Sequence, residues 1–376
     1  MKQSSNYESL ELHSKSEFAR AEVIVEALRS EALETIMDIR ANRITDLASL
    51  QQALQNAIEL EHATIPPYLT AYYTLSGDSP SVSYAKEAIQ AIVNQEMLHL
   101  TLACNVLNAI KGVPKIADAS FIPSYPDHLP MGIESGVTVH LKRYSRDLVQ
   151  NTFMKIEEPE IPIHIPVRTL AFAPVDIRTI GQFYAAIRAE IMRQGNRIFV
   201  GDRSRQVGGF LNAIEVTDVT SAVTAIDTIV RQGEGTPTSP TNKDSNFAHY
   251  YRFQELAMGM KIVPDASTFV GFSFDPQQPI TIDDNTDVIQ MADDPQLIQF
   301  DPADANVAQL ADVCDKTYSD LLRMLQGAFD GQPDKIGDAV GQMFSFEVAI
   351  ADLLAAPLTA GPNAGKFAGP RFRFVA

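Results

Sequence analysis

The sequence has few cysteines, no long apolar run and no basic patch. Only Cys104 and Cys314 occur among 376 residues, and both lie in apolar, helix-like stretches. This usage favours a reducing compartment over a disulfide-stabilised secreted domain. The N-terminal segment is polar with no apolar signal core, and no run of about 18 apolar residues is present. We therefore expect a cytoplasmic protein that is neither exported nor membrane-spanning.

The charge balance is strongly acidic. The chain carries 47 Asp and Glu against 30 Lys and Arg, a formal net charge of −17 at pH 7. Such a surface repels phosphate backbones and anionic lipid headgroups unless a local basic patch compensates, and the sequence has none of useful length. We expect no nucleic-acid partner and no membrane partner. A small-molecule substrate is the partner that remains, and assembly into a homo-oligomer is left open.

Hydrophobic periodicity predicts a mainly α fold. From Thr45 to about Leu75 apolar residues recur at steps of three and four, which is the period of one helix face. A second such stripe runs from Ile89 to Ile110, and turn residues at 76–80 separate the two stripes, with Ser81 or Ser83 as a helix cap. Further helices are predicted from 180, from 223, at 245–258, and as a closing pair at 306–329 and 334–354.

These elements divide the chain into three parts. Residues 1–45 form a mixed-charge arm that we expect to be helical. Residues 46–262 hold the main helical domain, interrupted by a proline-punctuated insertion at 112–175. Residues 263–376 form a C-terminal extension with short strands and two helices. A chain of this length has room for that many structural units, at about 150 residues each.

Three polar side chains, Glu61, Glu96 and His99, interrupt the apolar stripes of the first two helices. An unpaired ionised carboxylate there is costly unless a cation, a proton or a hydrogen-bond network compensates it. The Glu96-x-x-His99 spacing puts both side chains within reach of one ion, about 60° apart around the helix. The midpoint of 61 and 96 falls inside the predicted turn, so Glu61 should face Glu96. A buried hydrogen-bonded cluster without metal is the alternative.

A di-metal carboxylate site of this kind uses four carboxylates and two histidines. Glu190, Glu234 and His249, on the later helices, complete that count. No second Glu-x-x-His occurs, and solvated surface positions are the alternative for all three. The other histidines are expected at the surface: His13, His62, His128, His140 and His164.

Two adjacent prolines follow Glu61 by just over one helical turn. Pro66 and Pro67 remove two backbone donors, so we expect a kink or bulge, or alternatively a helix that ends near Ile65. Tyr68 follows them, and we consider it as a catalytic residue in a redox or substrate-contacting role, with aromatic core packing as the alternative. Glu347 also interrupts an apolar stretch, but no partner suggests its role.

Several of these motifs resemble one known family. The segments 61–69 (EHATIPPYL), 95–99 (QEMLH), 232–235 (QGEG) and 249–253 (HYYRF) are similar to the ferritin-like domain of iminophenyl-pyruvate dimer synthases, from violacein- and rebeccamycin-type pigment pathways. The resemblance spans about residues 46–260. It implies a ferritin-like four-helix bundle, here with loop and strand insertions and a C-terminal helical extension. It also implies a non-haem iron site, with these ligands: Glu61, Glu96, His99, Glu234 and His249.

The functional expectation combines the site and the resemblance. Two metal ions, iron or manganese, would react with O2 or peroxide and oxidise a small organic substrate in secondary metabolism. The resemblance implies that this substrate is derived from an amino acid. Two alternatives are an iron-storing ferritin relative with ferroxidase chemistry only and a metal-free binding scaffold. The insertion 112–175 and the two-helix extension favour the first function, because we expect them to wall a substrate cavity.

Overall fold

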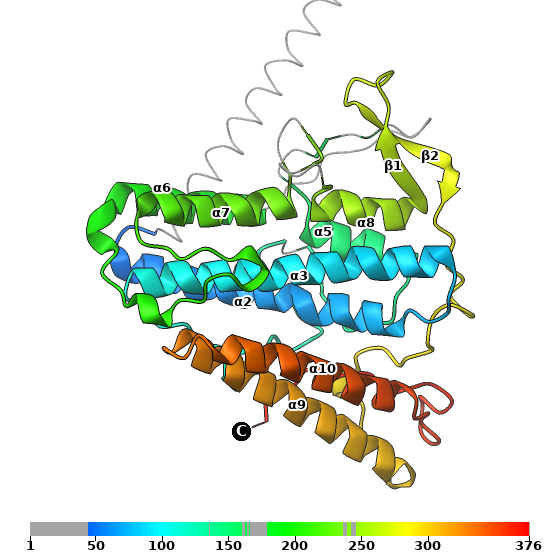
Figure 1. Cartoon of the computed structure of the whole chain (residues 1–376). Helices are drawn as coiled ribbons and strands as arrows, with labels where there is room; N and C mark the ends of the chain where they lie inside the picture. Colours follow the sequence, from blue (N-terminus) through cyan, green and yellow to red (C-terminus); the bar gives the residue numbers. More distant parts are fainter. Residues whose placement is uncertain are drawn as a thin grey trace, which may run out of the picture. The chain divides into compact units, whose positions relative to one another are not determined.

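The computed structural model describes residues 44–134, 136–159, 162–163, 165, 179–235, 239–241 and 246–375. The chain divides into two units, Met1–Thr45 and Asp46–Ala376. The predicted N-terminal arm therefore lies almost wholly outside the described residues. The helices and strands of the second unit are labelled in Figure 1.

Two long helices form the first layer of the bundle. Helix α2 (Leu47–Thr74) starts at a capping box, in which Asp46 accepts from the Ser49 amide while the Ser49 hydroxyl accepts from the Asp46 amide. Helix α3 (Pro80–Ala109) has proline at its first position and is capped by Ser79, rather than by Ser81 or Ser83. The predicted turn at 76–80 is confirmed, and it makes α2 and α3 antiparallel neighbours.

Helix α2 runs through Pro66 and Pro67 without a break, so the interpretation of a helix ending at Ile65 is wrong. Pro67 has no N–H to give to the Ala63 carbonyl, and the Tyr125 hydroxyl donates to that oxygen instead, at 2.8 Å. A loop side chain thus replaces the lost helical hydrogen bond and lets the helix continue beyond Glu61.

Shorter helices form the second layer. Helices α6 (Ile180–Gln194) and α7 (Val219–Gly233) pack on each other and on one half of the α2–α3 pair. Helix α8 (His249–Met258) packs on the other half together with the segment Arg146–Ile156. That segment is a run of α4 (Arg146–Leu148), the π-helix η3 (Val149–Phe153) and α5 (Met154–Ile156). Figure 1 shows the two short pairs end to end along α3, so the predicted insertion contains part of the bundle.

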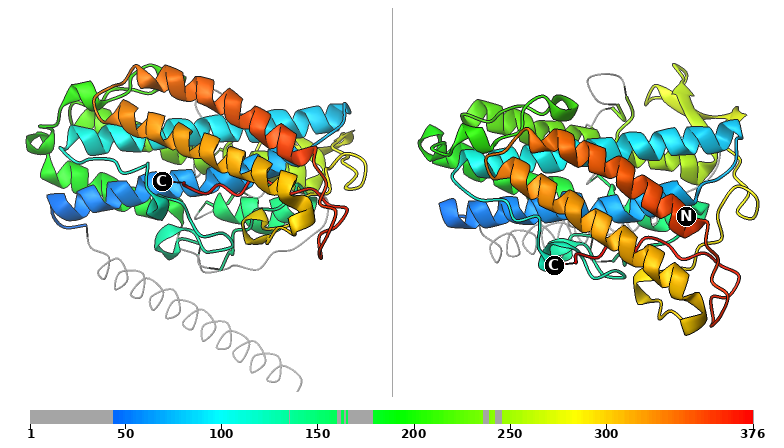
Figure 2. Two further views of the ribbon diagram at one scale, coloured as in Figure 1. Left: turned by 90° about the horizontal axis from the view of Figure 1, so that it is seen from below. Right: turned by 60° about the horizontal axis from the view of Figure 1, so that its bottom comes forward.

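The C-terminal extension begins with a hairpin of β1 (Met260–Pro264) and β2 (Phe272–Pro279), antiparallel with an irregularity after Met260. It ends with α9 (Ala305–Phe329) and α10 (Lys335–Leu354), which confirm the two predicted closing helices. These two pack together on the side of α2 and α3 opposite the second layer (Figures 1 and 2). Glu347 is exposed on α10.

Short 3-10 helices punctuate the connections: η1 (Ala119–Phe121), η2 (Pro130–Gly132), η4 (Asn196–Ile198), η5 (Arg203–Arg205), η6 (Phe210–Asn212), η7 (Pro295–Leu297) and η8 (Pro302–Asp304). The structure is thus mainly α, as the sequence predicts, and its bundle consists of α2 and α3 with two end-to-end pairs of shorter helices. None of the helices in the described ranges is long and apolar enough to cross a lipid bilayer.

Candidate metal centre

The first two helices bring Glu61, Glu96 and His99 together in the bundle interior. His99 Nδ1 lies 3.2 Å from Glu61 Oε2 and 3.6 Å from Glu96 Oε2. All three side chains are buried, with at most 4 % of each residue exposed. The two helices therefore meet in the register that the turn at 76–80 predicts.

A second group shares Glu96 with the first. His249, the first residue of α8, has its Nδ1 2.9 Å from Glu96 Oε1 and 3.4 Å from Glu157 Oε2. Glu96 therefore turns one carboxylate oxygen toward each imidazole. The two imidazole rings lie nearly parallel, with centroids 5.6 Å apart. In each group the three candidate ligand atoms lie within 4.8 Å of one another.

The two groups have matching surroundings. Behind His99, its Nε2 lies 2.8 Å from Gln232 Oε1, and behind His249, its Nε2 lies 2.9 Å from Gln95 Oε1. The outer carboxylates each accept a hydrogen bond from a buried tyrosine: Glu61 from the Tyr184 hydroxyl, and Glu157 from the Tyr68 hydroxyl at 2.6 Å. Each half thus consists of one glutamate, one histidine, one glutamine and one tyrosine, and Glu96 joins the halves.

Burial and mutual attraction shift the pKa values of these groups. Burial raises the pKa of Glu61 to about 7 despite the neighbouring His99. Burial alone would also raise the pKa of Glu96, but His249 and His99 hold it below its usual range. For His99, burial would lower the pKa, yet the contacts with Glu61 and Glu96 raise it to about 10. Without metal, protons on the imidazoles therefore supply the positive charge that the carboxylates need.

The donor set fits metal ions in that role. Although close to two carboxylates, His249 Nδ1 forms no hydrogen bond in proper geometry with any described residue. It is fully buried, so bulk water does not reach it. Carboxylate oxygens and imidazole nitrogens are ligands that iron, manganese and zinc accept. The two overlapping groups are therefore a candidate di-metal site.

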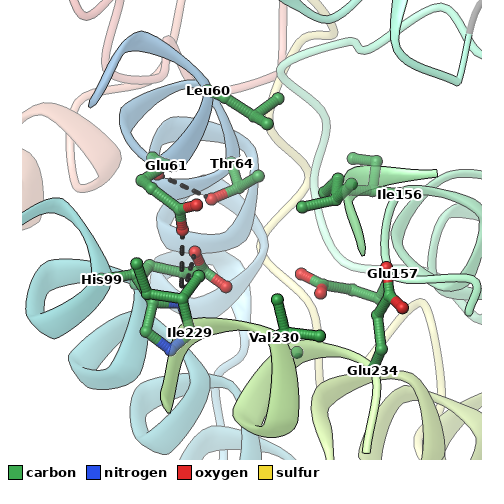
Figure 3. A pocket seen from close by; sticks show the side chains of 12 residues that line it. Leu60, Glu61, Thr64, His99, Ile156, Glu157, Ile229, Val230 and Glu234 are labelled. Atoms are coloured by element: carbon green, nitrogen blue, oxygen red, sulfur yellow. Dashed lines mark hydrogen bonds and ion pairs between the residues drawn. The ribbon is translucent and has the colours of Figure 1, made fainter. Parts of the chain in front are cut away.

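A small cavity of about 20 Å³ adjoins the candidate ligands. A volume above about 10–15 Å³ holds one water-sized molecule. In Figure 3, Glu61 and His99 lie on one side of it, with Glu157 and Glu234 on the other. The remaining wall is mostly apolar and is formed by Leu60, Thr64, Ile156, Ile180, Ile229, Val230 and Gly233.

Comparisons with known proteins agree with this architecture. A family profile described as Ferritin-like matches residues 54–258. The chain belongs to the ferritin-like family. Its fold is similar to the crystal structure of a ferritin-like protein from Caulobacter vibrioides, which is 24 % identical, with a TM-score of 0.59 over 89 % of this chain and 100 % of that one.

A curated relative is also similar to this ferritin-like chain. Dichlorochromopyrrolate synthase from Lentzea aerocolonigenes is 23 % identical, and the match covers 88 % of this chain. The chain spans 36 % of the length of that relative. These matches confirm two parts of the resemblance that the motifs indicate. The chain belongs to the ferritin-like family, and it is related to synthases of this kind.

Glu157 is a candidate ligand that was not predicted from the sequence. It directly follows α5, with its amide bonded to the Phe153 carbonyl at 3.2 Å. The π-helix Val149–Phe153 just before it shifts the helical register, a feature frequent at functional sites. Glu157 stands four residues after Phe153 and eight after Val149, both fully buried, so helical spacing indicated that Glu157 lies on the buried face. The charged sequence Glu157-Glu158-Pro159, however, is typical of an exposed helix end.

Glu190 does not join either group among the described residues, which corrects the count that assigned it. Its carboxylate accepts from Arg193 Nε and Nη2, both at 2.6 Å, and from Gln194 Nε2 at 2.7 Å. The Arg193 guanidinium holds the pKa of Glu190 below its usual range. The buried Glu190 carboxylate is thus neutralised within its own helix, and Glu157 is the glutamate that lies with the other candidate ligands.

Glu234 lies beside the cavity but outside both groups. It is half-buried, and its Oε1 accepts from the Gly181 amide at 2.5 Å, at the N-terminus of α6. A side chain at Gly181 would collide with this carboxylate, since a Cβ would lie 2.4 Å from Glu234 Oε2. The carboxylate at the end of α7 thus interacts with the positive end of the α6 dipole.

The surface prediction for the other histidines is wrong for His62. This residue is buried, and its Nε2 forms a short hydrogen bond with the Tyr318 hydroxyl of α9. Burial lowers the pKa of His62 to about 3. His128 is exposed and His140 is partly exposed. His13 and His164 lie outside the described residues.

Proposed function

We propose that this ferritin-like chain binds two metal ions, with iron as the preferred metal, and uses O2 or peroxide to oxidise a small organic substrate. The observation that carries the proposal is the shared Glu96, whose two oxygens face two separate Glu–His groups. A buried cluster of three carboxylates and two imidazoles is costly unless cations or protons balance it. The ferritin-like fold presents the same kind of donors on facing helices in di-iron and di-manganese proteins.

The residues around the candidate ions have distinct tasks in this proposal. Bound ions supply the redox chemistry toward O2. Glu61 and Glu157 would each hold one of the two ions, and the Tyr68 hydroxyl keeps a proton at Glu157 Oε1. The Tyr68 ring is fixed between Phe153 and Phe253, at centroid distances of 4.7 and 5.0 Å. Burial raises the pKa of Tyr68 well above its usual range, so its hydroxyl remains a donor at neutral pH.

The substrate class rests on the similar synthase and on the motifs. The resemblance to iminophenyl-pyruvate dimer synthases implies an amino-acid-derived compound of secondary metabolism, and the similar relative is a dichlorochromopyrrolate synthase. The chain has two buried free thiols, Cys104 and Cys314, which suit the proposed cytoplasmic setting. Every described residue that lines the small cavity lies between 60 and 234, so the C-terminal extension takes no part in this lining. The insertion does contribute, through Ile156 and Glu157.

A ferroxidase is the second candidate function, and the cavity size favours it. A volume of about 20 Å³ admits O2 or water but not an amino-acid-sized molecule. Organic oxidation therefore requires the cavity to open, for instance where half-buried Glu234 meets the start of α6. A ferroxidase needs no such opening.

The deciding experiment loads the full chain with Fe²⁺ without oxygen, measures iron per chain, and then adds O2 with and without candidate amino-acid-derived imines. The proposal expects two ions per chain and a coupled organic product. If iron is oxidised at the same rate with and without the organic candidates, and every candidate remains unchanged, only the ferroxidase function is supported. A chain that binds no metal with Glu61, Glu96 and His99 intact would overturn both.

A further inference from the structure

Each candidate histidine ligand is backed by the side-chain amide of a glutamine from another helix. Gln232, on the last turn of α7, meets His99 of α3, and Gln95 of α3 meets His249 of α8. We infer that Gln232 and Gln95 are positioning residues, each dedicated to one of the two metal positions. The inference rests on the proposed function, because it concerns how that site is held.

The chemistry of the contact fixes which nitrogen faces the metal position. An amide oxygen accepts hydrogen bonds and cannot donate, so the facing Nε2 of each histidine carries a proton. The remaining nitrogen, Nδ1, is the one directed at the carboxylates. Once its own proton leaves, Nδ1 offers a lone pair to an ion. The glutamine therefore selects the ligating tautomer and holds the ring in place.

Each buried imidazole depends on its glutamine as the hydrogen-bond partner of Nε2. The imidazoles are 2 % and 0 % exposed, so bulk water cannot replace a lost amide. Both acceptors are neutral, whereas a carboxylate in this position would raise the basicity of the imidazole. Because the amide and the histidine come from different helices in each case, the bond also ties those helices together at the site.

The effects should be separable, because the two groups share Glu96 and no other member. Gln232 touches the group of Glu61, Glu96 and His99. Gln95 supports the group of Glu96, Glu157 and His249. Loss of one glutamine should therefore weaken one metal position and leave the other close to its original affinity.

The test is a calorimetric titration of the full chain with Co²⁺, using Gln232→Leu and Gln95→Leu. Each variant is expected to lose about 10–100-fold in affinity at one of two positions, the usual effect of removing such a partner of a metal-bound histidine. Anomalous scattering at the cobalt edge then shows which position is depleted. Gln232→Glu and Gln95→Glu keep an acceptor and should restore tight binding. Gln194→Leu, which removes a contact with Glu190 outside the site, is the matched control.

The outcomes separate this inference from the proposed function. If the unaltered chain binds two ions and the leucine variants bind both as tightly, the positioning roles are wrong and the di-metal site stands. Equal weakening of both positions by either variant also contradicts the one-to-one assignment. If the unaltered chain binds no Co²⁺, Fe²⁺ or Mn²⁺, the proposed function fails and the inference fails with it. Circular dichroism of the metal-free variants checks folding, and the glutamate variants provide the test if a leucine variant unfolds.

Discussion

Glu96 is the residue on which the candidate site depends most. Each of its oxygens faces a different imidazole, whereas Glu61 and Glu157 each belong to one group. The periodicity of α3 predicted both Glu96 and His99, since each interrupts an apolar helix face. The shared position gives Glu96 a role that spacing alone did not reveal.

Substitution of the carboxylates should therefore have unequal effects. We expect Glu96→Gln to lose both metal ions, because an amide is a much weaker ligand than a carboxylate, while Glu61→Gln and Glu157→Gln each lose one. Glu190→Gln serves as the control and should retain both. Metal per chain by elemental analysis measures this, and an unchanged content in Glu96→Gln would contradict the assignment.

The buried imidazoles should make metal-free stability depend on pH. In the unfolded chain His99 loses its proton near 6.5, but in the folded, metal-free chain it does so at about 10. Its stabilising contribution is therefore complete below about pH 6.5 and is lost as the pH rises toward 10. Glu61, raised from 4.5 to about 7, loses its contribution over the lower interval in the same direction.

Thermal unfolding between pH 6.5 and 10 tests this expectation. The metal-free chain should lose stability across that range, and the increase in Tm on adding metal should grow, because ions replace the departing protons. His99→Gln should have a shallower slope, and the remaining slope belongs to His249, whose pKa Glu157 and Glu96 also raise. A metal-free Tm that falls with pH as steeply in the variant as in the original chain would contradict the account.

At the scale of elements, the sequence predicted the long helices well and the π-helix not at all. The stripes of α2 and α3, the turn between them and the closing pair α9 and α10 follow from periodicity and turn residues. The segment Arg146–Ile156 is short, follows proline-rich loops and contains a register change, so periodicity could not show that it completes the bundle. A short helical piece near 148–156 could be predicted, but only as part of an insertion, so the count of carboxylates fell on Glu190 in place of Glu157.

A single deletion in the π-helix should separate the two metal positions. Gln150 is exposed, so its removal takes no side chain from the core while converting the π turn to an α turn. Glu157 would then rotate by about 100° around the helix axis. We expect one ion per chain, held by Glu61, Glu96 and His99, as seen in metal analysis and anomalous maps. Retention of both ions would show that the π turn does not position Glu157.

At the scale of the whole chain, the C-terminal extension supports the bundle from behind the site. Helix α9 reaches α2 through the Tyr318 hydroxyl and His62, the residue next to Glu61, and the Phe329 carbonyl accepts from Asn108 Nδ2 at 3.1 Å. None of the described cavity-lining residues comes from the extension. Its contacts are therefore with the scaffold, and a buried His62 could not be predicted without knowing that α9 covers it.

Removing the Tyr318 hydroxyl should affect stability without changing metal binding. Tyr318→Phe leaves His62 Nε2 buried without this partner, which costs about 1–3 kcal/mol of unfolding free energy. Urea unfolding of the metal-free chain measures the loss, and elemental analysis should still find two ions per chain. Unchanged stability would show that this contact is not a significant attachment of the extension.

Anomalous diffraction at the iron and manganese edges, on crystals of the full chain grown with Fe²⁺ or Mn²⁺, tests the central claim most directly. The account predicts two peaks, one contacted by Glu61, Glu96 and His99 and the other by Glu96, Glu157 and His249, with ligand bonds of about 2 Å. No peak at these side chains, or ions bound only elsewhere on the chain, would contradict it.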